Sequence, residues 1–429
     1  MTTKLYQDDV YVREWDGKII SIAEGRDGIP TFDVILDRTA FFPEGGGQSC
    51  DLGTIECSGT TYEVIDVQED KDQVVHTIQP SGACEGEASS GPSPTPKTGD
   101  TVHCLLNWDR RFDNMQRHCG EHILSGIFYA RCGGVNRGFH MGEDYMTIDI
   151  SLEDDPADED AIRPEQIDMD LALDCERRAN QVIWSDAPVS VYRFDDRDEV
   201  RDMPLRKALA FDEDISIVCV GSPENASDCV ACCGTHPSSA GQVGLIKIYK
   251  VENYKGMFRI YFEAGARALK DYETKHNILT SLANDHSSSV EELPEVIRSL
   301  EEKLAGAKNE LYHARKALIA RETAVIDSLL EASDASLFLH RLEDLNIDDA
   351  FELAKTYMGK VPGLLMLYAA DQTSFILASS GEPHCGNLVR EYASFYKGKG
   401  GGNDTSARAI FTNEEDAMLF VDLIDKHLR

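Results

Sequence analysis

Residues 109–134, DRRFDNMQRHCGEHILSGIFYARCGG, form the segment on which the interpretation of this chain depends. Asp109 is a candidate N-cap and the closing glycine pair is a typical stop signal, so the segment predicts a helix over residues 110–131. His118 and His122 lie four residues apart within it. Because four residues make about one helical turn, both imidazoles leave the same face and can share one metal ion.

A second pair with the same spacing occurs much later in the chain. Cys232 and His236 are four residues apart in the segment CCGTH. One thiolate and three imidazoles make a donor set that suits tetrahedral zinc, which binds nitrogen and sulfur without redox chemistry. Each pair alone is also compatible with ordinary buried thiols and histidines. The occurrence of both pairs in one region therefore predicts a shared zinc site, in which Cys233 is an alternative thiolate ligand.

The composition limits the class of protein. The 429 residues include 42 Lys and Arg against 76 Asp and Glu, a net charge of −34, with 42% hydrophobic residues. This balance excludes a disordered chain and a uniformly basic nucleic-acid-binding surface, so any contact with nucleic acid must be local. No apolar stretch is long enough to span a membrane and the first residues do not resemble a signal peptide, so we expect a cytoplasmic protein. Twelve dispersed cysteines predict free thiols or metal ligands.

The pattern along the chain predicts an α+β protein. Short alternating runs predict a small β-barrel-like domain at the N-terminus, and strands mixed with helices predict a two-layer α+β domain after it. A later helical segment carries apolar residues in a 4-3 spacing over three heptads, typical of a coiled-coil hairpin or a dimer helix. These seam residues are Ile297, Leu300, Leu304, Ala307, Leu311, Ala314 and Leu318. A compact α/β domain closes the chain, with expected strands at residues 363–369 and 374–378 and a closing helix at 414–427. The expected boundaries are 1–100, 101–265, 266–333 and 334–429.

Three successive glycines stand out in the first domain. Gly45, Gly46 and Gly47 precede Gln48 in the segment FFPEGGGQ. Glycines expose backbone N–H groups and tolerate positive φ, so a ligand or another part of the backbone can approach closely. The alternative is an ordinary β-turn between strands.

A second glycine-rich segment lies near the C-terminus. It combines Lys397 and Lys399 with neighbouring glycines and aromatic residues, and Arg390 lies shortly before it. This combination is typical of a local basic surface for nucleic acid, although a flexible loop would have a similar composition.

One rival function follows from the first histidine pair. The segment HCGEH also fits the H-x-x-E-H pattern of inverted zinc metallopeptidases, in which the carboxylate, here Glu121, activates a water molecule. That pattern requires a downstream carboxylate as a further metal ligand, and Cys232 and His236 have no role in it. The peptidase interpretation therefore ranks second.

Taken in order, these segments resemble the alanyl-tRNA editing family, which includes the freestanding AlaX proteins and the matching half of alanyl-tRNA synthetase. The resemblance spans nearly the whole chain and has the long architecture, with a coiled coil and a C-terminal domain similar to the DHH-associated domain of the synthetases. It is carried by residues 42–48 with Asp51 and Gly53, 116–122, 232–236, 241–248, 259–268 and 397–407.

The resemblance implies a zinc-dependent hydrolase that deacylates tRNA(Ala) carrying serine or glycine. One Zn²⁺ per chain would be bound by His118, His122, Cys232 and His236. The sequence shows no counterpart of the aminoacylation domain, so the expected reaction is ester hydrolysis alone. The coiled coil or the C-terminal domain is expected to mediate a homodimer. A tRNA-binding protein with an inert site is a further alternative.

Roles for the remaining candidates follow from this resemblance together with their chemistry. Glu121 and Thr235 are the catalytic candidates. The substrate pocket is expected to involve Gly45, Gly46, Gly47, Gln48 and His140, because a site that hydrogen-bonds a hydroxyl can discriminate serine from alanine. Arg390, Lys397 and Lys399 are expected to contact tRNA phosphates.

Overall fold

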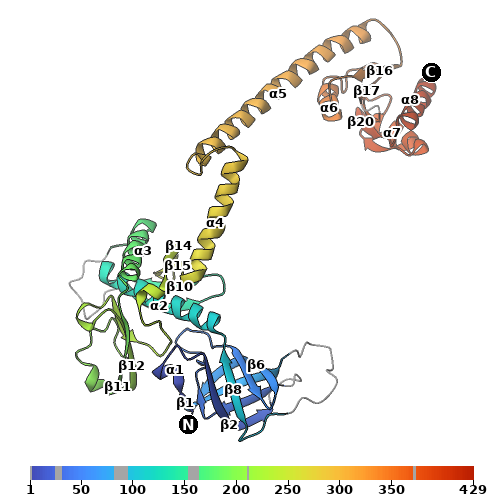
Figure 1. The fold of residues 1–429 in the computed structure, drawn as a ribbon. Coiled ribbons are helices and arrows are strands. Elements are labelled where there is room, and N and C mark those ends of the chain that lie inside the picture. The colour runs from blue at the N-terminus through green and yellow to red at the C-terminus, as the bar shows by residue number, and fades with distance from the viewer. Residues whose placement is uncertain (1, 25–30, 82–94, 153–163, 210–211, 371–372) are drawn as a thin grey trace. The chain divides into compact units, whose positions relative to one another are not determined.

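The computed structural model describes residues 2–24, 31–81, 95–152, 164–209, 212–370 and 373–429 (Figure 1). The chain forms two compact units, Met1–Leu279 and Thr280–Arg429. It is a mixed α+β protein with a six-stranded antiparallel β-barrel near the N-terminus and a long helix in the second unit. No helix within these described ranges is long and apolar enough to cross a membrane.

The N-terminal barrel confirms the expected β domain, but its closure differs from expectation. Its strands alternate between buried and exposed residues, so one face of each strand fills the barrel core. The last strand, β8, lies beyond residue 100 and closes the barrel between β2 and β5. The predicted boundary at 100 therefore cuts through the barrel. The strands, in barrel order, are β2 (Glu14–Glu24), β3 (Phe32–Leu36), β7 (Gln73–Pro80), β6 (Thr60–Asp70), β5 (Gly53–Cys57) and β8 (Thr101–Leu106).

The predicted central helix is confirmed as α2 (Trp108–Cys132). Its N-cap is Asn107, whose side chain accepts a hydrogen bond from the Arg110 backbone N–H, and the predicted cap Asp109 lies in the first turn instead. There its carboxylate faces the positive end of the helix dipole. Gly133, with a φ of 64°, ends the helix as expected.

Helix α2 packs on a four-stranded antiparallel sheet, and the two share one hydrophobic core with helix α3. A separate three-stranded sheet lies in the same unit and supplies the segment that follows β13. The four-stranded sheet consists of β14 (Ile246–Tyr254), β15 (Met257–Ala264), β10 (Met146–Ser151) and β9 (Val135–Met141). The other elements are α3 (Met169–Trp184), β11 (Val189–Asp196), β12 (Glu213–Val220) and β13 (Asp228–Ala231).

One pair of cysteines departs from the expectation of thiols or metal ligands. Cys219 and Cys229 are opposite one another on β12 and β13, with their Cα atoms 4.2 Å apart, and they form a disulfide. The expectation was wrong for this pair because the register of two strands, not the spacing in sequence, brings the two sulfurs together.

The second unit contains a five-stranded sheet with helices packed against it. The predicted strands at 363–369 and 374–378 and the closing helix are confirmed as β17, β18 and α8. Its elements are β16 (Leu337–Leu342), α6 (Ile347–Lys355), β17 (Leu364–Ala369), β18 (Ser374–Ala378), α7 (Cys385–Tyr392), β19 (Lys399–Gly402), β20 (Ser406–Ile410) and α8 (Glu414–Leu428).

The predicted coiled-coil segment contains two helices, α4 (Gly265–Asp285) and α5 (Leu293–Glu331), the second of which is 39 residues long. The C-terminal part of α5 packs into the core of the second unit through Ile326. By contrast, the predicted seam residues Ile297, Leu300, Leu304 and Leu311 are 44–55% exposed. The helix is thus observed, and the pairing of its seam stays a prediction.

Candidate metal centre

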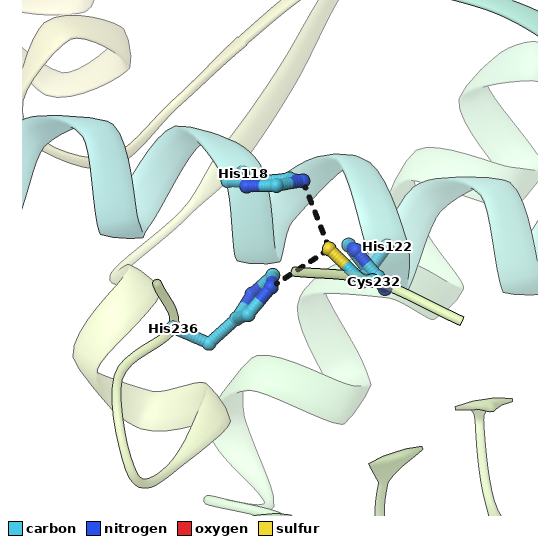
Figure 2. A group of neighbouring side chains, drawn as sticks. All are labelled: His118, His122, Cys232 and His236. Atoms are coloured by element: carbon cyan, nitrogen blue, oxygen red, sulfur yellow. Dashed lines mark hydrogen bonds between the residues drawn. The ribbon is translucent and has the colours of Figure 1, made fainter. Parts of the chain in front are cut away.

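Four ligands from two distant segments converge at one point in the first unit (Figure 2). His118 and His122 project from α2, and Cys232 and His236 belong to the segment directly after β13. The Cys232 Sγ atom lies 3.5 Å from His118 Nε2 and 3.4 Å from His236 Nε2, and all four ligand atoms lie within 4.8 Å of one another. Since bonds of about 2.0–2.3 Å to a tetrahedral ion place its ligands roughly 3.3–3.6 Å apart, the four residues could hold a metal ion.

Hydrogen bonds behind the histidines turn the ligand nitrogens towards this point. His118 Nδ1 lies 3.0 Å from Gln48 Oε1, and His122 Nδ1 lies 3.1 Å from Asp228 Oδ2. In each case Nδ1–H donates to an oxygen, which leaves the lone pair of Nε2 facing the centre. Such partners fix the tautomer and ring orientation of metal-binding histidines.

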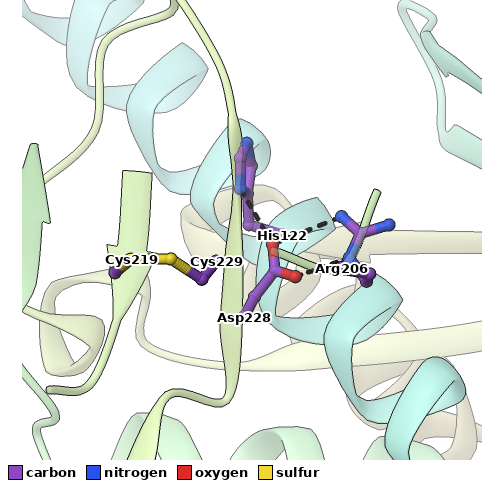
Figure 3. Close-up of a disulfide and its surroundings, with 5 residues drawn as sticks. All are labelled: His122, Arg206, Cys219, Asp228 and Cys229. Carbon is purple, nitrogen blue, oxygen red and sulfur yellow. Dashed lines mark hydrogen bonds and ion pairs between the residues drawn. A yellow bond between two sulfur atoms is a disulfide. The ribbon is translucent and has the colours of Figure 1, made fainter. Parts of the chain in front are cut away.

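Asp228 is itself held by a buried arginine (Figure 3). Arg206 Nε donates to Asp228 Oδ1 at 2.5 Å and Nη2 donates to Oδ2 at 3.2 Å. The contact of Asp228 with His122 needs a close approach of β13 to α2, and Gly126 permits it, because a Cβ atom there would lie 2.1 Å from the Ser227 carbonyl oxygen. The Cys219–Cys229 disulfide then ties β13 to β12 at the next residue.

The electrostatics of the centre favour the ligand form of the sulfur. Burial alone would raise the pKa of the Cys232 thiol, but the imidazoles of His118, His122 and His236 hold that pKa well below its usual value. Burial lowers the pKa of His236 to about 4, so this imidazole is neutral at pH 7. Burial acts in the same direction on His122, but the Cys232 thiolate and the hydrogen bond to Asp228 outweigh it and raise the pKa of His122 to about 10. A divalent cation at this point would therefore meet a thiolate that is already favoured and would displace a proton from His122.

Glu121 lies at the edge of the same centre and is only 5% exposed. Its Oε1 atom accepts hydrogen bonds from Ser125 Oγ at 2.6 Å and from Asn136 Nδ2 at 2.7 Å. Its Oε2 atom lies 4.0 Å from His122 Nε2. The carboxylate is therefore held in place by one oxygen, and the other oxygen is close to the metal ligands.

A cavity of about 500 Å³ opens beside the four ligands. Its wall includes His118, His122 and Cys232, so a molecule inside it can reach the centre directly. Apolar side chains such as Phe139 and Ile215 form part of the wall, and Cys233 presents its thiol there while Cys232 provides the sulfur of the ligand cluster. This size is typical of a site for a small molecule or for the end of a longer one.

The glycine triad forms a turn that contacts the centre. Gly46 and Gly47 have positive φ angles of 61° and 84°, and Gly45 pairs with Gln48 across the turn. Gly46 lines the cavity and approaches Cys233, because a Cβ atom at Gly46 would lie 3.3 Å from its Sγ atom. The segment is thus a turn, and the group that approaches Gly46 is the side chain of Cys233. The approach of a ligand stays a prediction.

Gln48 and Thr235 lie behind the metal ligands. Gln48 is fully buried, and its side chain contacts both the backbone N–H and the hydroxyl of Thr235. Neither residue belongs to the cavity wall formed by the described residues, although Gln48 was expected in the substrate pocket and Thr235 in catalysis. His140 is an exposed residue of β9 and is also outside that wall.

The three predicted tRNA-binding cations lie in the second unit and are exposed. Arg390 belongs to α7 and donates to Gly386 O and Asn387 Oδ1. Lys397 has a φ of 57° and lies just before the edge strand β19. Lys399 is the first residue of that strand.

Several residues of the centre were missed by the sequence analysis. Asp228 and Arg206 orient His122, and Ser125 and Asn136 hold Glu121. Ser125 could have been found, because it lies four residues after Glu121 on the same predicted helix. Asp228 is 106 residues from His122 and carries no local motif, so no spacing rule would have found it.

Comparisons with known proteins show what this chain is similar to. Residues 11–110 match the family described as tRNA synthetases class II (A), and residues 215–261 match the threonyl and alanyl tRNA synthetase second additional domain. The chain is 29% identical over 421 residues to the alanyl-tRNA editing protein AlaX-L of Pyrococcus horikoshii, which covers 95% of this chain and 94% of that protein.

Two further relatives differ in how much of their own length is matched. The chain is 32% identical over 267 residues to the alanyl-tRNA editing protein AlaX-M of Methanosarcina acetivorans, a match covering 61% of this chain and 98% of that protein. The alanine–tRNA ligase of Caldivirga maquilingensis is 28% identical over 420 residues, and this chain spans only 43% of the ligase. The chain therefore belongs to the AlaX family of alanyl-tRNA editing proteins.

Proposed function

We propose that this chain is a zinc-dependent hydrolase that removes a wrong amino acid, serine or glycine, from mischarged tRNA(Ala). The observation that carries the proposal is the convergence of His118, His122, Cys232 and His236 beside a cavity large enough for an aminoacyl ester. The family assignment provides the substrate class. The same ligand set makes the peptidase interpretation unnecessary, because Cys232 and His236 complete the donor set without a carboxylate.

The metal ligands are proposed to be those four residues, with one zinc ion per chain. When bound, zinc would supply polarisation of the ester or a water of lowered pKa. Gln48 and Asp228 keep His118 and His122 oriented, so they act as positioning residues. Thr235, which the sequence suggested as catalytic, acts through its hydrogen bonds to Gln48.

Glu121 is proposed as the group that accepts a proton from the attacking water. Its Oε1 atom is occupied by Ser125 and Asn136, whereas no hydrogen bond from the described residues reaches Oε2. A carboxylate fixed in this way at the wall of the cavity can serve as a general base. The ester bond is intrinsically labile, so positioning accounts for much of the expected rate enhancement.

The rest of the chain is proposed to bind the body of the tRNA. The barrel domain extends to Leu106, the zinc-binding editing domain follows it up to residue 265, helices α4 and α5 form the coiled-coil segment, and residues 334–429 form a DHH-associated domain. Arg390, Lys397 and Lys399 would contact phosphates, and the exposed seam of α5 would pair with a second copy of the chain. Sedimentation of Leu304→Glu against the parent protein tests the dimer.

The decisive experiment compares deacylation of Ser-tRNA(Ala), Gly-tRNA(Ala) and Ala-tRNA(Ala) by the parent protein, His118→Ala and Cys232→Ala. We expect the parent to release serine and glycine much faster than alanine, and both variants to be inactive. A parent protein that binds tRNA(Ala) and releases no amino acid supports the inert binding protein instead. Full activity in both variants excludes a catalytic metal.

A further inference from the structure

Two cations face the cavity beside the metal centre. Arg137 and Lys207 both line it, and within the ranges that the structure describes neither forms a hydrogen bond or an ion pair. Such an arrangement is unusual in a chain with a net charge of −34, in which most arginines of the first unit are paired. Unpaired cations at a cavity wall indicate an anionic ligand.

A β-bulge presents Arg137 to the cavity. In the pairing of β9 with β10, Asn136 is opposite Ile150 and Gly138 is opposite Asp149, so Arg137 is the extra residue. Bulges re-aim side chains next to functional sites. Since the side chain of Asn136 holds Glu121, the same bulge sets the positions of the proposed base and of this cation.

Lys207 is placed by its neighbour Arg206. The backbone N–H of Arg206 donates to Cys229 O at 2.8 Å, and its guanidinium donates to Asp228. Because both acceptors belong to β13, the adjacent Lys207 is held close to that strand. Burial lowers the pKa of Lys207, and the charges of Arg206 and Arg137 lower it further, against the opposing effect of Glu121 and Asp228. An anion bound between them would relieve this repulsion.

Arg206 adds a third donor at the same wall. Its Nη1 atom is buried without a hydrogen-bond partner among the described residues, and Figure 3 shows one terminal nitrogen of Arg206 pointing away from Asp228. A buried donor without a partner is costly, so its persistence fits a site that is completed by a ligand. The acidic residues of the wall are Glu121, which lies at the metal centre, and the exposed Asp214.

We propose that Arg137 and Lys207 bind the 5′-phosphate group of the terminal nucleotide of the tRNA substrate. This inference rests on the proposed function. In an aminoacyl-tRNA the ester joins a ribose hydroxyl of the terminal nucleoside, and the phosphate is attached to the 5′ oxygen of the same sugar. The cavity is lined by the metal centre and by these two cations, so it can hold both the ester and the 5′-phosphate of that nucleotide. The subsite fixes the distance between the phosphate and the reacting carbonyl.

The first test uses the full-length protein and Ser-tRNA(Ala). Arg137→Gln, Lys207→Gln and the double variant are compared with the matched control Lys255→Gln, which changes an exposed lysine in the turn between β14 and β15. We expect KM to rise about 10-fold for each single variant, with kcat within about two-fold of the parent. The slope of log(kcat/KM) against log[salt] should become shallower by about 0.7 for each cation removed.

The second test uses 3′-O-seryl-adenosine and its 5′-monophosphate as small substrates. The parent should hydrolyse the phosphorylated compound at least about 10-fold more efficiently, and the double variant should treat both compounds alike. Equal hydrolysis by the parent, or a phosphate preference that survives in the double variant, overturns the subsite. If the parent deacylates Ser-tRNA(Ala) but shows either of these two results, the phosphate subsite is wrong and the proposed function stands. If the parent does not deacylate Ser-tRNA(Ala), the proposed function is wrong as well. Unchanged zinc content and thermal midpoint show that the variants fold.

Discussion

The metal centre and the glycine-rich edge of the C-terminal sheet both carry polar residues that the sequence singled out, but they are built differently. At the centre His118 and His122 are nearly fully buried, and each has a partner that fixes its orientation. At the edge, Lys397 and Lys399 are exposed. A preorganised buried site suits chemistry, whereas an exposed cationic edge suits a large partner.

The glycines at the two places also have different causes. In the barrel domain Gly46 and Gly47 need positive φ for the turn at the centre. In strand β19, glycine is required by close packing, because a Cβ atom at Gly400 would lie 2.0 Å from the Arg408 carbonyl oxygen. A glycine-rich segment alone therefore does not indicate a ligand site, and the function of each region must be tested separately.

Outside the four metal ligands, the largest expected effect concerns Glu121. Glu121→Gln should lower kcat for Ser-tRNA(Ala) by about 10²–10³-fold, because an amide cannot accept the proton of the attacking water. The zinc content should not change, since the variant removes no ligand. Ser125→Ala serves as a milder control that removes one of the two hydrogen bonds to Oε1. A variant with parental kcat would remove Glu121 from the reaction.

A smaller effect is expected for the positioning residue Gln48. Gln48→Ala should weaken zinc binding by about 10–100-fold, because His118 loses the acceptor that sets its tautomer. Competition with a zinc-binding dye measures this affinity. The control is Gln68→Ala, an exposed glutamine of the same barrel that contacts Glu44. Equal zinc affinities in both variants would show that the contact to His118 is incidental.

The smallest effect on chemistry is expected at the exposed edge. Reversal of Arg390, Lys397 and Lys399 to glutamate should weaken binding of tRNA(Ala) by about 10-fold or more at low salt, because favourable phosphate contacts become repulsive. Hydrolysis of 3′-O-seryl-5′-AMP, which lacks the body of the tRNA, should stay at the parental rate. Unchanged affinity for tRNA(Ala), measured by filter binding, would refute the assignment of these residues.

The parts of the molecule that local spacing encodes could be predicted. The helix bearing His118 and His122 follows from its periodicity and its glycine stop, and the common spacing of the two ligand pairs identified the four residues that converge. The strands at β17 and β18 follow from short apolar runs. In each case the sequence pattern lies within a few residues of the structural feature that it predicts.

Features that depend on long-range register could not be predicted. Closure of the barrel by β8, the disulfide between Cys219 and Cys229, and the contact of Asp228 with His122 all depend on which strands become neighbours. The N-cap was misplaced by two residues, because both Asn107 and Asp109 are good caps and the barrel strand ends at Leu106. The sequence thus identified the four side chains that converge, but not the residues, such as Asp228, that orient them.

The most direct measurement is the zinc content of purified protein, determined together with deacylation of Ser-tRNA(Ala), for the parent, Cys232→Ala and Cys233→Ser. The account predicts one zinc per chain and full activity in the parent and in Cys233→Ser, and loss of both in Cys232→Ala. An active parent that contains no divalent metal, or a Cys232→Ala variant that keeps its metal and its rate, would contradict it.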